Sequence, residues 1–266
     1  MIPTETIDTL EQCWRSISEL ASGFSETQWK TATDLPGWSV QDNLSHLIGI
    51  ERMLQGLATT SHRAAATEYV RNPIGEMNEN EVDSRRSLTG SEVLQEWNQL
   101  VDTRLATLRT ADDDYFQQPA MTPTGPGTLA DFLHIRVLDC WLHEQDMRRA
   151  TDRPGNLAGP AAELTVDRLI RTLPIVVGKR AGTPEGGAVA IDITGGVDRH
   201  LFCEVQNGRA ALVAASTSAP LATIGLSTEA FVVLAAGRRT HDRVLATVAG
   251  DSELAQRVLG QLNMMI

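Results

Sequence analysis

The sequence has little cysteine, little positive charge and no long apolar run. Its three cysteines, Cys13, Cys140 and Cys203, lie far apart and form no CxxC pair, so they provide neither a disulfide framework nor a cysteine zinc site. Lys and Arg number 23 against 34 Asp and Glu, which gives a formal net charge of −11. This acidic balance argues against nucleic acid and anionic membranes as partners, because both require a basic surface.

No apolar stretch approaches the length of about 20 residues that spans a bilayer. The longest, such as AFVVLAAG at 230–237, are much shorter. The opening residues MIPTETIDTLEQ have no basic start followed by an apolar core, so we expect no secretory signal. These features predict a cytoplasmic protein without membrane contact. With 266 residues, 42% of them hydrophobic, the chain is long enough for one large domain or two ordinary ones.

The first 155 residues have the patterning of a helical bundle. Apolar positions recur at helical spacing over 6–24. Three capping-box pairs predict the starts of further long helices, which should run over about 40–60, 90–108 and 129–150: Ser39 with Asp42, Thr89 with Glu92, and Thr128 with Asp131. A short helix is expected within 72–86, and MTPTGPGT at 121–128 is expected to be a loop. Four long helices predict a four-helix bundle.

The remainder of the chain has a different texture. We expect one helix at 159–177, within a bridging segment 156–185. Stretches with β-type patterning, separated by Gly-Gly, Asn-Gly and Ser-rich turns, follow at 188–194, 199–206, 209–215 and 221–227. Two helices close the chain, with a strand near 243–250 between them. The predicted fold class is therefore α+β, with a bundle at 1–155, the bridging segment 156–185, and a small α+β domain at 186–266.

Three polar residues lie where the helical patterning predicts interior faces. His46 falls on a stripe of the second long helix, while Asp139 and His143 lie four positions apart on the fourth, where such side chains are neighbours. A carboxylate inside a dry bundle needs a cation or hydrogen-bond donors to offset its charge. Two histidines and one carboxylate, with positions left for water or substrate, have the composition of a catalytic metal site.

Ordinary pairing explains the same pattern. Asp139 can pair with Arg136, three positions earlier, and His143 can pair with Glu144 or Asp146 on a solvated face. A single interior histidine is also more often a hydrogen-bonded core residue than a metal ligand. The pattern alone leaves the metal site and the ordinary ion pairs open as alternatives.

Two motifs together resemble a known family. LPGWSVQDNLSHL at 35–47 and RVLDCWLHEQDMRRA at 136–150 are similar to the mycothiol-dependent maleylpyruvate isomerase family, within the wider DinB-like metalloenzymes. The stretch ATIGLSTEAFVVLAAGRR at 222–239 resembles the sterol-carrier-like C-terminal domain of that family. The resemblance covers nearly the whole chain. It implies a DinB-like four-helix bundle that binds metal, followed by a small sterol-carrier-like domain.

The resemblance also implies the ligands of a divalent metal, with zinc as the expected ion: His46, Asp139 and His143. The family usually has glutamate at the position of Asp139. Because aspartate is shorter, we expect the metal to lie nearer the fourth helix or one bond to lengthen. Asp146 is expected to orient one of the histidines from behind, or else to pair with Arg149.

A third element of the resemblance lies in the C-terminal domain, where the family can supply an arginine to an anionic substrate. The matching position here is Arg238, ahead of Arg239 in the GRR turn, and its fork of N–H donors suits a carboxylate. The alternative is that this turn is a helix C-terminus whose positive charge complements the helix dipole.

The activity that the resemblance implies is that of a thiol-dependent enzyme. Mycothiol would be the low-molecular-weight thiol cosubstrate, and its metal-stabilised thiolate would attack a small electrophile. Isomerase and S-transferase stay open as outcomes of this chemistry. A hypothesis of another class is a non-catalytic carrier that uses the sterol-carrier-like domain to bind an apolar ligand. A third is a regulatory protein built on a degraded site.

Overall fold

The computed structural model describes residues 1–265 of the chain, which divides into two compact units, Met1–Gly155 and Asn156–Ile266. The segment 156–185 therefore belongs to the second unit. No helix within the described residues combines the length and apolar character that crossing a membrane requires. The first unit is mainly helical and the second combines a sheet with helices, which confirms the predicted α+β class.

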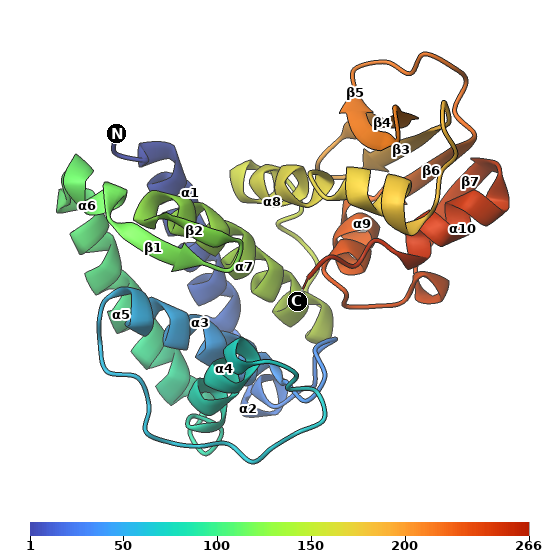
Figure 1. Ribbon diagram of the computed structural model, residues 1–266. Helices are drawn as coiled ribbons and strands as arrows, with labels where there is room; N and C mark the ends of the chain where they lie inside the picture. The colour runs from blue at the N-terminus through green and yellow to red at the C-terminus, as the bar shows by residue number, and fades with distance from the viewer. Residues whose placement is uncertain (266) are drawn as a thin grey trace. The chain divides into compact units, whose positions relative to one another are not determined.

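Four long helices form the first unit, and their order in the bundle places the second beside the fourth. They are α1 (Thr4–Ser22), α3 (Val40–Leu54), α5 (Gly90–Thr110) and α7 (Leu129–Ala150). Both α1 and α3 pack against α5 and α7 (Figure 1). Shorter elements connect them: α2 (Glu26–Trp29), α4 (Pro73–Asp83), α6 (Asp113–Gln117), β1 (Pro119–Thr122) and β2 (Gly125–Thr128). Because α3 and α7 are neighbours, side chains on their facing sides can meet.

The starts of the long helices follow from the predicted caps. Ser39, Thr89 and Thr128 each accept a hydrogen bond from the backbone N–H three positions on, and the acidic side chain there accepts one in return. All three capping boxes are thus confirmed. Inside the bundle, Trp97 is fully buried and meets the Trp14 ring edge to face, an arrangement that aromatic pairs favour.

Two expectations about this unit were wrong in detail. Helix α3 ends at Leu54, not near residue 60, because Gly56 adopts a left-handed backbone (φ 66°). Its N–H and that of Leu57 bond back to the carbonyls of Met53 and Arg52, a Schellman motif that terminates a helix. The expected loop MTPTGPGT takes part in an antiparallel hairpin, in which β1 pairs with β2.

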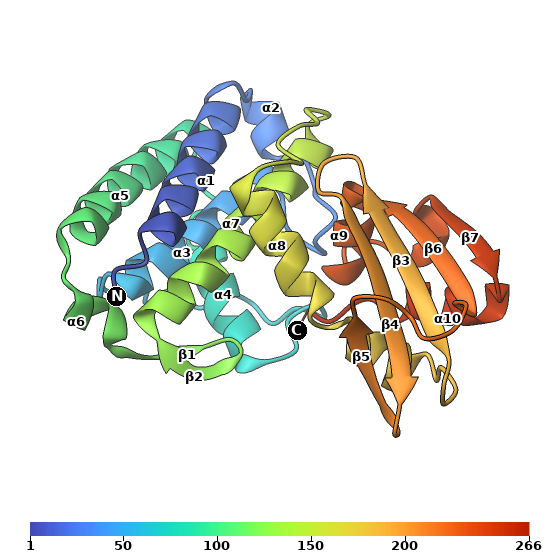
Figure 2. The ribbon, with the colours of Figure 1, turned by 90° about the horizontal axis from the view of Figure 1, so that it is seen from above.

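The second unit is built on a five-stranded sheet. Its strands are β3 (Ala188–Thr194), β4 (Arg199–Gln206), β5 (Arg209–Val213), β6 (Ala222–Ser227) and β7 (Ala246–Gly250). They lie in the order β5-β4-β3-β6-β7, which can be followed in Figure 2. Only the β3–β6 pair is parallel. In the central strand, buried Ile191 faces Leu201 of β4 and Ile224 of β6.

Helical elements complete the second unit: α8 (Pro160–Ile170), η1 (Ile175–Arg180), α9 (Thr228–Ala235), η2 (His241–Arg243) and α10 (Ser252–Gly260). Helix α9 packs against β3 and β6, and α10 against β6 and β7. The helix expected at 159–177 is interrupted. Helix α8 ends at Ile170, and the π-helical turn η1 begins directly after Pro174, which has no N–H to continue an α-helical ladder.

The cap of α3 is the local interaction that sets the start of the helix carrying His46. We expect Ser39→Ala to lower the free energy of unfolding by about 1 kcal/mol, because an N–H at the helix start loses its acceptor. All five tryptophans lie within residues 1–155, so urea unfolding followed by tryptophan fluorescence reports on the bundle. Ser61→Ala, at an exposed loop position, is the matched control, and equal losses in both variants would contradict the expectation.

Candidate metal site

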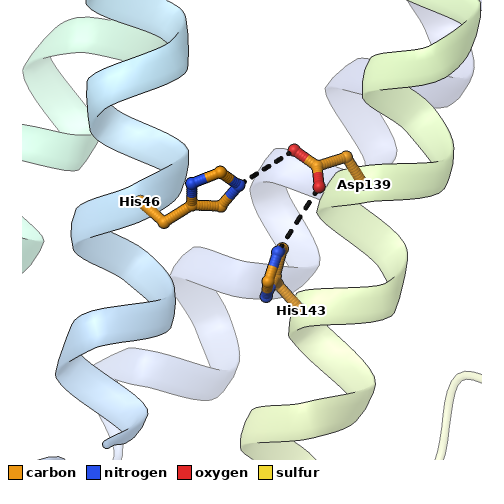
Figure 3. Close-up of side chains that lie close together, drawn as sticks. All are labelled: His46, Asp139 and His143. Carbon is orange, nitrogen blue, oxygen red and sulfur yellow. Dashed lines mark ion pairs between the residues drawn. The ribbon is translucent and has the colours of Figure 1, made fainter. Parts of the chain in front are cut away.

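Two neighbouring helices bring the three candidate ligands together. His46 lies on α3, and Asp139 and His143 lie one turn apart on α7. His46 Nε2 is 3.4 Å from Asp139 Oδ2, and His143 Nε2 is 3.4 Å from Asp139 Oδ1. Figure 3 shows both imidazoles turned toward the carboxylate. One ligand atom from each residue lies within 4.8 Å of the other two, so His46 meets two residues that lie 93 and 97 positions further along the sequence.

The separations within this trio are compatible with a shared cation. Charged N–H···O hydrogen bonds are normally about 2.7–2.9 Å long, shorter than the 3.4 Å found here. Two ligands bound tetrahedrally to zinc at about 2.0–2.2 Å lie about 3.3–3.6 Å from each other. Two imidazole nitrogens and a carboxylate oxygen are also donors that zinc accepts. The residues present therefore fit a divalent ion.

Asn43 holds His143 in the orientation that such a site needs. Its Oδ1 is 2.7 Å from His143 Nδ1, while its own amide nitrogen donates to the Ser39 carbonyl and the Thr33 hydroxyl. Because the Asn43 nitrogen donates to these two acceptors, its oxygen must accept from the imidazole, so Nδ1 carries the proton. The lone pair of His143 is then on Nε2, the atom that faces Asp139.

Asp146 also lies near this imidazole, but at a longer distance. Its Oδ2 is 3.6 Å from His143 Nδ1, and its other oxygen forms an ion pair with Arg149. Arg149 additionally pairs with Asp34. Asn43, not Asp146, is thus at hydrogen-bond distance of Nδ1, and a direct orienting role for Asp146 stays a prediction.

Arg136 keeps the carboxylate of Asp139 ionised. Burial by itself would raise the pKa of Asp139, but the Arg136 guanidinium and His46 outweigh it and hold that pKa well below its ordinary value. Burial lowers the pKa of His46, although Asp139 opposes this shift. The carboxylate is therefore charged while the His46 imidazole is neutral near pH 7, which is the state in which both can bind a cation.

The charge of Arg136 is itself compensated deeper in the bundle. Arg136 Nε donates to Glu51 Oε1 at 2.8 Å, and both side chains are almost completely buried. Arg104 lies 3.6 Å from the second Glu51 oxygen and donates to the Tyr115 hydroxyl. Positive and negative charges therefore alternate along a row that runs from Arg104 through Glu51 and Arg136 to Asp139. This row has no net charge before any cation binds.

Trp38 forms one wall of the candidate site. Its ring centroid is 5.3 Å from that of His46 and 6.0 Å from that of His143. The indole N–H donates to Glu79 of α4 at 2.9 Å, and Tyr69 and Arg86 bind the same carboxylate. Trp38 is therefore held at the site by its own hydrogen bond, a role that its position just before the Ser39 cap did not reveal.

The remaining candidate, Arg238, belongs to the second unit. It follows α9 and Gly237, and its backbone N–H bonds to the Val233 carbonyl while its side chain donates to the Ala236 carbonyl. These are contacts of a helix C-terminus, in line with the alternative stated for the GRR turn. A role for Arg238 toward substrate stays a prediction.

The comparisons with known proteins identify the family. The family described as mycothiol maleylpyruvate isomerase N-terminal domain matches residues 10–148, more than half of the chain, and the chain therefore belongs to it. The fold is similar to a crystal structure of the mycothiol-dependent maleylpyruvate isomerase (17% identity, 93% of each chain covered, TM-score 0.57) and to one of a histidine-to-alanine mutant of that isomerase (16%, 93% of each chain, 0.57). No curated protein matches the sequence. Family and fold are those of an enzyme, an isomerase.

The chain offers no reactive thiol of its own for such chemistry. Cys13, Cys140 and Cys203 are all buried. Burial raises the pKa of Cys140 to about 12, although the nearby Arg136 opposes this shift, and it raises that of Cys203 to about 12. It also raises the pKa of Cys13 well above its ordinary value. A thiol nucleophile would have to be a separate molecule.

We therefore expect the native protein to react very slowly with an aromatic disulfide reagent at pH 8, because thiolates are the reactive species and these three thiols are neutral and covered. Unfolding in guanidinium should release all three thiols for rapid reaction. Spectrophotometric titration before and after unfolding measures this directly. A fast-reacting equivalent in the folded protein would show that one cysteine is available as a nucleophile.

Proposed function

We propose that this protein is a divalent-metal-dependent enzyme that activates a low-molecular-weight thiol, mycothiol, for addition to a small electrophile. The observation that carries this proposal is the convergence of His46, Asp139 and His143 within 4.8 Å. Membership of the mycothiol maleylpyruvate isomerase family and the similarity of fold to that isomerase support it. Because the three cysteines are all buried, the thiol of this proposal is a separate molecule.

Each residue of the site has a defined part in this proposal. His46 and His143 would bind a divalent ion, zinc by preference, through their Nε2 atoms, and Asp139 through a carboxylate oxygen. The bound ion would lower the pKa of a thiol and hold its thiolate, which is the nucleophile. Asn43 keeps the lone pair of His143 directed at the site, and the Trp38 ring packs beside both imidazoles.

The proposed reaction begins with bond formation between the thiolate sulfur and one carbon of a conjugated double bond, whose electron pair moves onto the adjoining carbonyl. Rotation about the resulting single bond and re-formation of the double bond expel the thiolate and give the trans isomer. In an S-transferase, a proton would instead be added to the carbon and the new C–S bond kept. Arg238 is proposed to hold a carboxylate of the substrate.

We expect the purified protein to bind about one zinc per chain, and His46→Ala and His143→Ala to weaken this affinity by more than about 100-fold. Asn43→Ala should weaken it by about 10–100-fold, because His143 loses the group that orients it. Metal analysis after dialysis against graded chelator measures these changes. His62→Ala removes a histidine that pairs with Asp83 on the surface and is the matched control. Equal zinc content in all variants would contradict the ligand assignment.

The activity itself is tested by a screen of electrophiles with mycothiol, with and without chelator. We expect consumption of electrophile to require both thiol and metal, and to be lost in His46→Ala but not in His62→Ala. Product analysis then separates an isomerase, which returns the thiol, from an S-transferase, which does not. Zinc binding without thiol-dependent turnover would overturn the enzyme proposal in favour of a carrier.

A further inference from the structure

Strand β7 forms one edge of the sheet in the second unit, and one of its two sides is unpaired. It pairs with β6, and no other strand among the described residues pairs with it (Figure 2). Residues 247–250 of this strand are all exposed. The free N–H and C=O groups of an edge strand are a template to which a further strand can add.

The pairing with β6 shows which backbone groups of β7 face outward. The Asp251 N–H donates to the Leu221 carbonyl, so residues 249 and 247 of the same register also direct their N–H and C=O groups toward β6. These directions alternate along an antiparallel strand. Ala246 and Val248 therefore direct their backbone groups away from the sheet, and Val248 lies at the centre of this outward edge.

The edge of β7 lacks the features that usually prevent strand addition. The stretch LATVAG at 245–250 contains neither a charged residue nor a proline, although these are common protections of an edge strand. Leu245 is 93% exposed and Val248 is 36% exposed. The opposite edge of the sheet differs, because β5 begins with Arg209 and packs against η1. A strand added to β7 would bury apolar surface that now faces water.

This edge is complementary to a second copy of itself. Two antiparallel β7 strands related by a two-fold axis at Val248 would place Val248 opposite Val248, and Ala246 opposite Gly250. In that register the outward N–H of Val248 in each copy meets the outward carbonyl of Val248 in the other. A contact between two identical patches also closes after two copies and leaves no patch free for a third.

The charges at the two ends of β7 suit the same register. Arg243 lies three residues before Ala246, Glu253 lies three residues after Gly250, and both side chains are exposed. Antiparallel pairing brings the start of one strand beside the end of the other, so Arg243 of each copy would lie near Glu253 of the other copy. The adjacent Asp242 is already engaged, because a hydrogen bond with Thr240 lowers its pKa.

We propose that the outer edge of β7 is an interaction surface at which two copies of this chain join their sheets. The match of backbone groups and of end charges about one two-fold axis favours a second copy over a strand of unrelated sequence. The proposal is independent of the proposed function, because His46, Asp139 and His143 all belong to the first unit. Since the contact is only one strand wide, we expect a dimer that dissociates on dilution.

Analytical ultracentrifugation of the full chain over about a 100-fold range of concentration tests for this dimer. We expect the mass to rise from one chain to two. Val248→Lys should raise the dissociation constant more than about 10-fold, because two lysines would face each other at the axis. Leu212→Lys places the same charge on β5 at a position 37% exposed and should leave the constant unchanged. A chain that stays monomeric throughout, or equal effects of both substitutions, would overturn the proposal.

A charge exchange tests the register. Arg243→Glu should weaken the dimer about 10-fold, because two surface ion pairs become two repulsions. Adding Glu253→Arg to the same chain restores opposite charges and should restore the affinity. Both positions are exposed, so the substitutions leave the core intact. A double variant that dimerises no better than Arg243→Glu would contradict the proposed register.

Amide hydrogen exchange locates the contact residue by residue. The N–H groups of Ala246 and Val248 face outward in the single chain, so we expect their protection to increase with protein concentration. Those of Thr247 and Ala249 face β6 already, and their protection should change little. A dimer that forms without added protection at Ala246 and Val248 would use another surface, and the proposal would be wrong.

Discussion

The site depends on how one carboxylate is kept charged inside a helical bundle. A fully buried ion without compensation costs on the order of several kcal/mol, and Asp139, whose side chain is 24% exposed, faces part of this penalty. Asp139 meets this requirement with Arg136, whose charge is in turn balanced by Glu51. Because a permanent cation already holds the carboxylate, Asp139 does not depend on a protonated histidine for its charge, and the His46 imidazole, whose pKa burial lowers, keeps its lone pair available. The candidate metal site is a consequence of this charge balance.

The rest of the first unit positions that balance. Capping boxes begin α3 and α7, and the adjacency of these helices brings their polar faces together. Helix α4 contributes from the side, where its Glu79 accepts the hydrogen bond of the Trp38 indole and holds that ring beside the histidines.

Much of this arrangement could be predicted because it depends on short sequence patterns. A capping box is contained in four residues, and the i,i+4 pair of Asp139 and His143 shares one helix face wherever the helix lies. The roles of Asn43 and Glu51 could not be predicted in this way, because their partners lie 100 and 85 positions away. The sequence left an ion pair between Asp139 and Arg136 as an alternative to convergence of Asp139 with the histidines. The structure contains both contacts. Asp139 Oδ2 lies near both Arg136 and His46, and its Oδ1 lies near His143.

The central claim, that side chains 46, 139 and 143 hold one divalent ion which a thiol can join, is tested most directly by X-ray absorption at the zinc edge of the loaded protein. The account predicts nitrogen and oxygen neighbours at about 2.0–2.2 Å, with the multiple-scattering signature of two imidazoles, and a new sulfur neighbour at about 2.3 Å once mycothiol is added. A zinc environment without imidazole, or one that mycothiol leaves unchanged, would contradict it.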